Sequence, residues 1–328
     1  MRCVENKEHG FKKLWALSLG IIVAFCAFQW SCSSTSPDPQ EDLLLSSEWV
    51  GAADWDNATA LTVVMKENAD DSLAFDPADL TFTAGQPYIV TIQNPTGNLS
   101  KHYWTAAEFF QAVAWRKAQT VDAEYKAPYF KAFELVTGDT KSIDLYFIPV
   151  TTGTYEILCT IEGHVARGMT GTITVEGNEN LSLDQEVAAN WNSALDSDAR
   201  TSGSNVVWDT ALDVPVELKE ISETEYAFDP SDLPLTQDTG YKLEIFSSDA
   251  NLEKHYFTAT EFYKTNVWRK AEDSQAEIKA PYLNAVELLV GGSTTLFIVP
   301  TVADTYDSIC TIEGHSDLGM VGTVTVSP

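Results

Sequence analysis

The sequence predicts an all-β protein made of two tandem β-sandwiches. One observation is an internal repeat, because the segments AFDPADL, TAAEFF, WRKA and KAPY return as AFDPSDL, TATEFY, WRKA and KAPY about 150 residues later. The other is that each copy consists mostly of short runs rich in β-branched and aromatic residues, bounded by turn residues. Such a repeat is one domain duplicated, and 328 residues are enough for two cores.

The repeat and the composition divide the chain into five segments. In the segment between the two copies, Val187, Trp191 and Leu195 recur at helical spacing, which predicts a short helix from about 184 to 196. The predicted segments are an export signal or membrane anchor (1–31), a flexible tether (32–46), a first domain (47–177), a linker (178–204) and a second domain (205–328).

The first residues are typical of an export signal. Lys12 and Lys13 precede an apolar run over residues 14–30, and Cys32 follows at its end. This junction resembles a bacterial lipoprotein cleavage site, although Trp30 departs from the usual pattern. We expect the protein in the cell envelope, on the periplasmic or extracellular side. Lipid anchoring at Cys32, an uncleaved anchor and plain secretion are the three alternatives.

Five β-rich runs recur in each copy. The run GTYEILC places Tyr155, Ile157 and Cys159 on one strand face, so the thiol points the same way as core residues. Short antiparallel strands joined by turns predict a sandwich. The expected strands lie at residues 61–65, 88–92, 142–150, 153–159 and 172–175, and at residues 214–221, 241–245, 294–300, 304–310 and 323–326.

One segment of each copy departs from the strand pattern. TAAEFFQAVAWRKAQ contains Phe109, Val113 and Trp115 at near-helical spacing and has no Gly or Pro. We therefore expect a helical insertion from about Thr105 to Thr120, and an equivalent one in the second copy.

Two ligand-like motifs organise the chain. CTIEGHVARGM, from Cys159 to Met169, returns as CTIEGHSDLGM with the same spacing, and KHYW returns upstream as KHYF. Past Cys32, every Cys and every His of the sequence belongs to these motifs, so no thiol remains for a structural disulfide. The predicted ligand sets are His102, Cys159, His164 and Met169 in the first copy, and His255, Cys310, His315 and Met320 in the second.

Two imidazoles, one thiolate and one thioether are the donors of a mononuclear copper site built for electron transfer. Zinc is the alternative, but Met is a poor zinc ligand and a structural zinc site would need a fourth Cys, His or carboxylate. A chance meeting of a core Cys with a surface His is the other alternative. The upstream His102 and its counterpart His255 argue against chance, because the arrangement occurs twice.

The loop CTIEGH, followed by Gly-Met before a final strand, resembles the cupredoxins, the blue copper proteins of the plastocyanin, azurin and rusticyanin kind. The resemblance covers both copies. It implies two Greek-key sandwiches, each with one type 1 copper, so two copper ions per chain cycle between Cu(I) and Cu(II). The helical insertion after the first His is larger than in the family core.

The leading interpretation is an exported carrier of single electrons between redox proteins and not an enzyme. His164 and His315, next to Val165 and Leu318, would be exposed electron ports. A copper storage or delivery protein of the envelope is the alternative. A two-domain multicopper oxidase or nitrite reductase fits less well, because such enzymes need further His ligands.

The net charge of −28 bears on partners. So acidic a surface repels nucleic acid and anionic lipid, so we expect membrane contact only through the N-terminal anchor. Basic redox partners such as a cytochrome c are the expected ones. Ser308 stands where the first copy has Ile157, and we expect it to give the second site a different potential.

Overall fold

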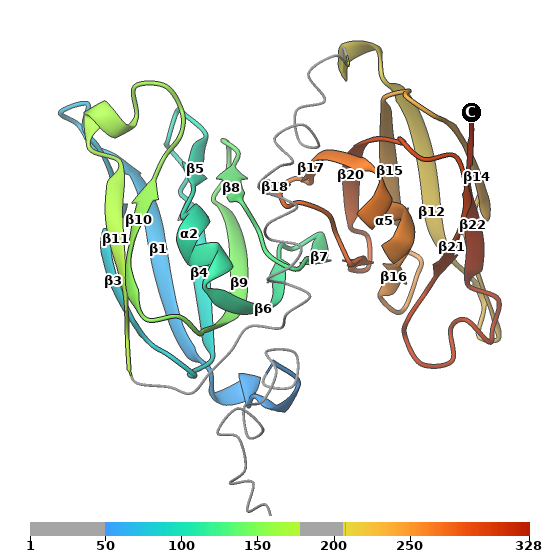
Figure 1. The fold of residues 1–328 in the computed structure, drawn as a ribbon, viewed down its shortest axis with the longest axis horizontal. Coiled ribbons are helices and arrows are strands. Elements are labelled where there is room, and N and C mark those ends of the chain that lie inside the picture. Colours follow the sequence, from blue (N-terminus) through green and yellow to red (C-terminus); the bar gives the residue numbers. More distant parts are fainter. Residues whose placement is uncertain (1–49, 178–205, 207) are drawn as a thin grey trace, which may run out of the picture. The chain divides into compact units, whose positions relative to one another are not determined.

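The computed structural model describes residues 50–177, 206 and 208–328 (Figure 1). The expected export signal, the tether and the linker helix lie outside this part. The described residues form two β-sandwich halves, which confirms the predicted fold class. No helix in the described ranges is long and apolar enough to cross a membrane.

The first half contains all five strands expected for it. Each lies within a strand of the structure, except that Val150 and Cys159 follow directly after the third and the fourth. The elements are η1 (Trp55–Asn57), β1 (Thr59–Glu67), β2 (Leu73–Asp76), β3 (Asp79–Thr83), β4 (Tyr88–Asn94), β5 (His102–Trp104), α2 (Ala107–Gln111), β6 (Val113–Gln119), β7 (Ala123–Lys126), β8 (Ala132–Leu135), β9 (Lys141–Pro149), β10 (Gly153–Leu158), η2 (Val165–Arg167) and β11 (Thr170–Glu176).

The second half repeats this order, except that no 3-10 helix equivalent to η2 is present in its ligand loop. Its elements are η3 (Trp208–Thr210), β12 (Leu212–Ser222), β13 (Glu225–Asp229), β14 (Asp232–Thr236), β15 (Tyr241–Ser247), β16 (His255–Phe257), α5 (Thr260–Thr265), β17 (Val267–Glu272), β18 (Ala276–Lys279), β19 (Ala285–Leu288), β20 (Ser293–Val299), β21 (Thr305–Ile309) and β22 (Val321–Ser327).

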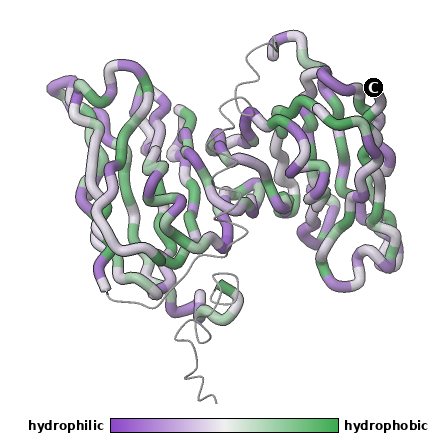
Figure 2. Tube along the Cα trace, in the orientation of Figure 1, coloured by the Kyte–Doolittle hydropathy of each residue, from purple (hydrophilic) through white to green (hydrophobic). Residues whose placement is uncertain are grey.

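Each half packs a three-stranded sheet against a larger one. The small sheets are β10-β11-β3 and β14-β22-β21. Strands such as β4 alternate buried and half-buried residues along their length, as a period of two requires. Hydrophobic residues therefore follow the strands of both halves in Figure 2, and many turns are hydrophilic. The aromatic core of the first half includes Phe82, Phe109 and Phe147, whose rings contact one another.

The predicted helical insertion is wrong over most of its length. The helix α2 covers only Ala107–Gln111, and the WRKA segment belongs to strand β6. Strand β6 forms a short hairpin with β7 and pairs along most of its length with β9. The β9 residues are distant in sequence, so local spacing does not reveal this pairing. The indole of Trp115 closes the short helix by donating to Phe110 O at 2.7 Å. The second half repeats this with α5, β17 and the indole of Trp268, which donates to Tyr263 O.

The large sheets exchange strands between the halves. Strands β5 and β8 continue the sheet of the second half through β18, and strands β16 and β19 continue that of the first through β7. The strand that carries His102 therefore lies in a sheet built mainly from the other half. Neither half is an isolated sandwich, although each is a copy of the other.

Charged side chains line both of these junctions. Across each pairing two glutamates face each other, Glu134 opposite Glu277 and Glu124 opposite Glu287. Lysines compensate them, because Lys101 pairs with Glu134 and Lys270 with Glu277. Burial raises the pKa of Glu134. In Glu277 burial acts the same way, but hydrogen bonds with Glu134 and Lys270 bring the pKa to about 2. In each pair, therefore, the pKa of one carboxyl is raised and that of the other is lowered.

A tyrosine next to each upstream His completes each junction. The hydroxyl of Tyr103 donates to Glu277 at 3.1 Å and accepts from Lys279 at 2.5 Å, both in the second half. In the same way Tyr256 accepts from Lys126 of the first half at 2.6 Å. We call the two groups the junction clusters. They consist of Lys101, Tyr103, Glu134, Lys270, Glu277 and Lys279, and of Lys117, Glu124, Lys126, Lys254, Tyr256 and Glu287.

The Asp273→Ala substitution is expected to destabilise the chain by about 2 kcal/mol or more. The carboxylate of Asp273 accepts from Thr120 at 2.6 Å and from Tyr125 at 2.7 Å, so its loss removes the charged acceptor of two largely buried hydroxyls of the other half. The acceptors that remain are Thr294 Oγ1 for Tyr125, at 2.8 Å, and Ala123 O for Thr120, at 3.4 Å. Urea unfolding measures the change. Asp122→Ala is the matched control, because Asp122 accepts from Ser274 in an exposed contact between the halves. Equal losses in the two variants would contradict a buried role for Asp273.

Candidate metal centres

Two hydrogen bonds bring the upstream His and the Cys together. Thr105 N donates to Leu158 O at 3.1 Å, and Leu158 N donates to Thr105 O at 2.9 Å. This isolated bridge joins the end of β5, in a large sheet, to the end of β10, in a small sheet. His102 and Cys159 lie next to the bridge, so residues 57 positions apart meet at one end of the sandwich.

The ligand loop is held by its own backbone. His164 N donates to Ile161 O, Met169 N donates to His164 O, and Cys159 N donates to Met169 O, all at 3.1 Å. Gly163, before the His, has a φ of 82°, which a residue with a side chain rarely adopts. The conformation of the loop is therefore built into the chain and does not need a metal to explain it.

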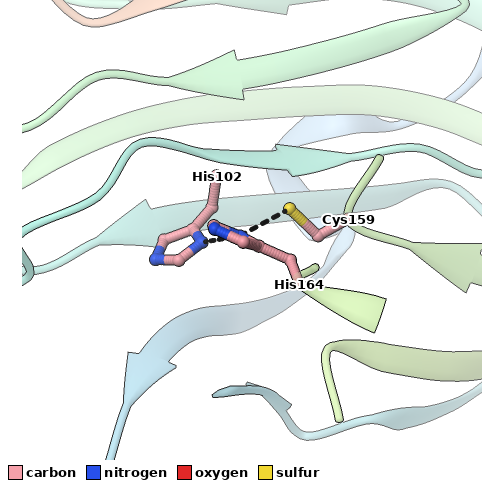
Figure 3. A group of neighbouring side chains, drawn as sticks. All are labelled: His102, Cys159 and His164. Atoms are coloured by element: carbon pink, nitrogen blue, oxygen red, sulfur yellow. Dashed lines mark hydrogen bonds between the residues drawn. The ribbon is translucent and has the colours of Figure 1, made fainter. Parts of the chain in front are cut away.

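The donor atoms of the first centre converge (Figure 3). His164 Nδ1 lies 3.2 Å from His102 Nδ1 and 3.3 Å from Cys159 Sγ. All three side chains are buried, with 6% of His164 exposed. The backbone N–H of Tyr103 also donates to Cys159 Sγ at 3.3 Å, which favours a thiolate.

Burial keeps these groups neutral in the absence of a cation. Burial, followed by the charge of His164, lowers the pKa of His102 to about 4. Burial and then the charge of Arg167 lower the pKa of His164, and burial raises that of the Cys159 thiol. At neutral pH both imidazoles therefore offer a free lone pair. A bound cation would favour the thiolate over the thiol.

A carboxylate orients the first imidazole. Glu67 Oε1 lies 3.2 Å from His102 Nε2, and the same carboxylate accepts from Leu99 N at 3.0 Å and Ser100 N at 2.8 Å. Burial raises the pKa of Glu67, but these N–H groups outweigh it and lower the pKa overall. An ionised Glu67 accepts the Nε2 proton of His102, which leaves the Nδ1 lone pair facing the sulfur.

The second centre repeats the first with small differences. His315 Nδ1 lies 3.1 Å from His255 Nδ1 and 3.5 Å from Cys310 Sγ. Tyr256 N donates to Cys310 Sγ at 3.3 Å, and Glu220 Oε1 lies 3.2 Å from His255 Nε2. The bridge between Thr258 and Ile309 again joins the two sheets.

The surroundings of the second centre differ in three residues. Glu253 Oε2 lies 3.0 Å from His315 Nε2, where the first half has Ser100. The ring of Tyr226 lies 4.6 Å from the ring of His315, where the first half has Leu73. Ser308 is buried on β21 and shares the buried face with Cys310, as expected.

The structure brings together six of the eight predicted ligands. His102, Cys159 and His164 form one trio, and His255, Cys310 and His315 form the other, with donor atoms within 4.8 Å of one another in each. Met169 and Met320 are buried, and their backbones close the ligand loops. Their role as axial ligands stays a prediction.

Two aspects of the sites differ from the sequence interpretation. His164 and His315 were expected to be exposed, but only 6% and 4% of their surfaces reach solvent, because the loop folds back over them. Glu67, Glu220 and Glu253 were missed. Glu67 and Glu220 are equivalent positions of the two copies, so the repeat itself contained a signal for them. Glu253 occurs in one copy only, and nothing in the sequence marked it.

Two neutral imidazole nitrogens and one thiolate, held in a buried trigonal group, fit copper. The fold and the two centres thus define a copper-binding β-sandwich protein. Residues 61–176 match the family of copper-binding proteins of the plastocyanin and azurin kind. The second half repeats the sequence and the donor set of the first, so each half has one candidate copper site.

Three of the solved structures that match this chain are two nitrite reductases and auracyanin B. A copper-containing nitrite reductase from Thermus scotoductus has 12% identity over 82% of this chain and 62% of its own, with a TM-score of 0.28. The copper nitrite reductase from Nitrosomonas europaea has 14% identity over 83% and 94%, with a TM-score of 0.27. Auracyanin B has 23% identity over 36% and 90%, with a TM-score of 0.25. The chain spans less than two thirds of the Thermus enzyme. A comparison with curated proteins found no match.

The Glu67→Gln substitution is expected to weaken copper binding at the first site by about 10- to 100-fold. The amide cannot supply the negative charge that holds the Nε2 proton of His102 and leaves Nδ1 as the donor. Competition with a chelator, in a Cys310→Ser background that leaves one site, measures the affinity. Glu162→Gln is the control, because Glu162 is an exposed carboxylate of the ligand loop. An affinity within twofold of the parent would contradict the orienting role.

The metal-free protein is expected to lose stability as the pH falls from about 6.5 to about 4. The pKa of His102 is about 4 in the folded chain, against 6.5 for an unperturbed imidazole, so the unfolded chain binds more protons in this window. The contribution of His102 to the free energy of unfolding is present above pH 6.5 and is on the order of 3 kcal/mol. Urea unfolding across this range measures it, with His102→Gln as the comparison. An equally steep loss in that variant would place the effect elsewhere.

Proposed function

We propose that the protein is an exported carrier that passes single electrons between redox proteins. The observation that supports this most is the convergence of His102, Cys159 and His164, and of their counterparts in the second half, in buried groups fixed by the scaffold. Copper bound there supplies one-electron exchange. The chain's own residues supply donor positions that need little rearrangement.

Small rearrangement is what an electron carrier requires. The Cys159 sulfur accepts from Tyr103 N, and the His102 imidazole is held by Glu67, so two of the donors have protein partners besides a metal. The ligand loop is closed by backbone hydrogen bonds. A donor set held in this way changes little between the two oxidation levels, and the trigonal arrangement suits both.

The histidine count favours a carrier over an enzyme. The chain has five His, of which four form the two trios and His9 lies in the leader. A catalytic copper of the nitrite reductase or multicopper oxidase type would need more imidazoles than this chain offers. Storage or delivery of copper is the second candidate. Buried donors favour it less, because a delivery site exchanges its metal with a partner.

Basic redox proteins, such as a cytochrome c, are the partners we propose. The chain carries a net charge of −28, which raises the rate of encounter with a basic surface. Docking near the solvent edge of His164 or His315 would give the shortest path, and Val165 is half-exposed beside His164. A place in the cell envelope, with lipid attachment at Cys32, fits the leader.

Copper-loaded protein is expected to absorb strongly in the visible range and to cycle repeatedly between colourless and coloured forms, with two copper ions per chain. Reduction by a basic cytochrome c should slow as ionic strength rises from 0.01 to 0.1 M, because the Debye length falls from about 30 to about 10 Å. Stopped-flow absorption measures the visible band and the rate of its loss on reduction. A neutral reductant is the control, whose rate should stay nearly constant.

Three outcomes would contradict the proposed carrier. A protein that stays colourless when loaded with Cu(II) would exclude type 1 sites. Rapid and complete loss of copper to a chelator, faster than electron exchange, would favour delivery instead. Turnover of nitrite or oxygen by the purified protein would favour an enzyme.

A further inference from the structure

One carboxylate distinguishes the two centres at the imidazole nitrogen that does not face the sulfur. Glu253 Oε2 lies 3.0 Å from Nε2 of His315, and about half of the Glu253 side chain is exposed. The equivalent residue of the first half is Ser100. In the described part of the chain, no carboxylate lies within 4 Å of a nitrogen of His164.

Other residues around His164 and His315 also differ in charge between the two halves. In the second half, Glu223 and Glu253 line one pocket together with Glu220 and Tyr226. Of these carboxylates only Glu253 distinguishes the halves, because the first half has Glu67 and Asp70 at the positions of Glu220 and Glu223. In the first half, Arg167 follows the ligand His and pairs with Asp71 at 2.6 Å, whereas the equivalent residue of the second half is Leu318. The second centre therefore has more negative charge and less positive charge near its outer edge.

Charge at this position acts on the oxidised and reduced forms unequally. A carboxylate that accepts the Nε2 proton of a ligand imidazole makes the imidazole a stronger donor. The oxidised cation carries one more positive charge, so a nearby negative charge stabilises it more than the reduced form. Both effects lower the reduction potential. Solvent screens the exposed carboxylate in part, so direct contact with the imidazole matters more than the wider rim.

We propose that Glu253 lowers the reduction potential of the second site below that of the first, so that an electron shared by the two sites resides mainly on the first. This inference rests on the proposed function, since it assumes that both sites exchange single electrons. It gives the carrier a direction: a donor meets the second site, and an acceptor draws from the first.

The test is a redox titration of the copper-loaded full chain, with each site assigned through the single-site variants Cys159→Ser and Cys310→Ser. At one electron per chain, the first site should hold the electron in about ten of eleven chains, a tenfold ratio that corresponds to 59 mV for one electron. Glu253→Gln should raise the potential of the second site, and Ser100→Glu should lower that of the first. Each variant should reduce the ratio several-fold, and the double variant should bring it to unity or below.

Glu223→Gln is the matched control, because Glu223 lines the same pocket but makes no hydrogen bond or ion pair with His315, so it should change the ratio less than Glu253→Gln. A second measurement uses the metal-free protein. Its ¹⁵N NMR spectrum should show the Nε2–H form of His315 less populated in Glu253→Gln, and that of His164 more populated in Ser100→Glu.

The inference is overturned if the second site has the higher potential in the parent protein, or if Glu253→Gln changes the ratio no more than Glu223→Gln. Those outcomes would not contradict the proposed function as an electron carrier, because both copper sites would still cycle between oxidation levels. Failure of either site to cycle in the parent would instead contradict the proposed function.

Discussion

The two hydrogen bonds between Thr105 and Leu158 are the constraint on which the first centre depends. They join a large sheet to a small one at the point where β5 and β10 end. His102 belongs to the first sheet and Cys159 follows the second, so neither sheet alone can hold the donor set. A site assembled across two sheets is as rigid as the packing between them, which is the property that electron exchange with little rearrangement requires.

Each centre also depends on the opposite half. Strand β5 continues a sheet of the second half, and the hydroxyl of Tyr103 is held by Glu277 and Lys279. The backbone N–H of the same Tyr103 donates to Cys159 Sγ. One residue therefore links the sulfur of the first centre to a charged cluster of the other half, and Tyr256 does the same in reverse. Buried lysine–glutamate groups are costly unless they are well paired, so these contacts favour one register of the two halves.

Much of the fold and most of each site could be predicted from the sequence, because the signals were local and repeated. Alternation along GTYEILC placed Cys159 on the buried face, and the repeated CTIEGH loop with its upstream His identified both trios. The strand Val113–Gln119 was mistaken for helix, because its partners are distant in sequence and its hydrophobic spacing is ambiguous over so few residues. The exchange of strands between halves was missed for the same reason. Pairing within a copy and between copies uses the same residues, so no pattern in one copy distinguishes them.

Duplication explains which residues were free to differ. Positions that hold the donor atoms are the same in both halves: Glu67 matches Glu220, and Tyr103 matches Tyr256. The differences lie around them, at Ser308, Tyr226 and Glu253 in the second half. A substitution at the donor atoms would abolish binding, whereas one at their outer edge changes only the energy of the two oxidation levels. Two copies of one scaffold can therefore keep the same geometry and still differ in how strongly each holds an electron. That difference is what a chain with two equivalent folds needs if electrons are to cross it in one direction.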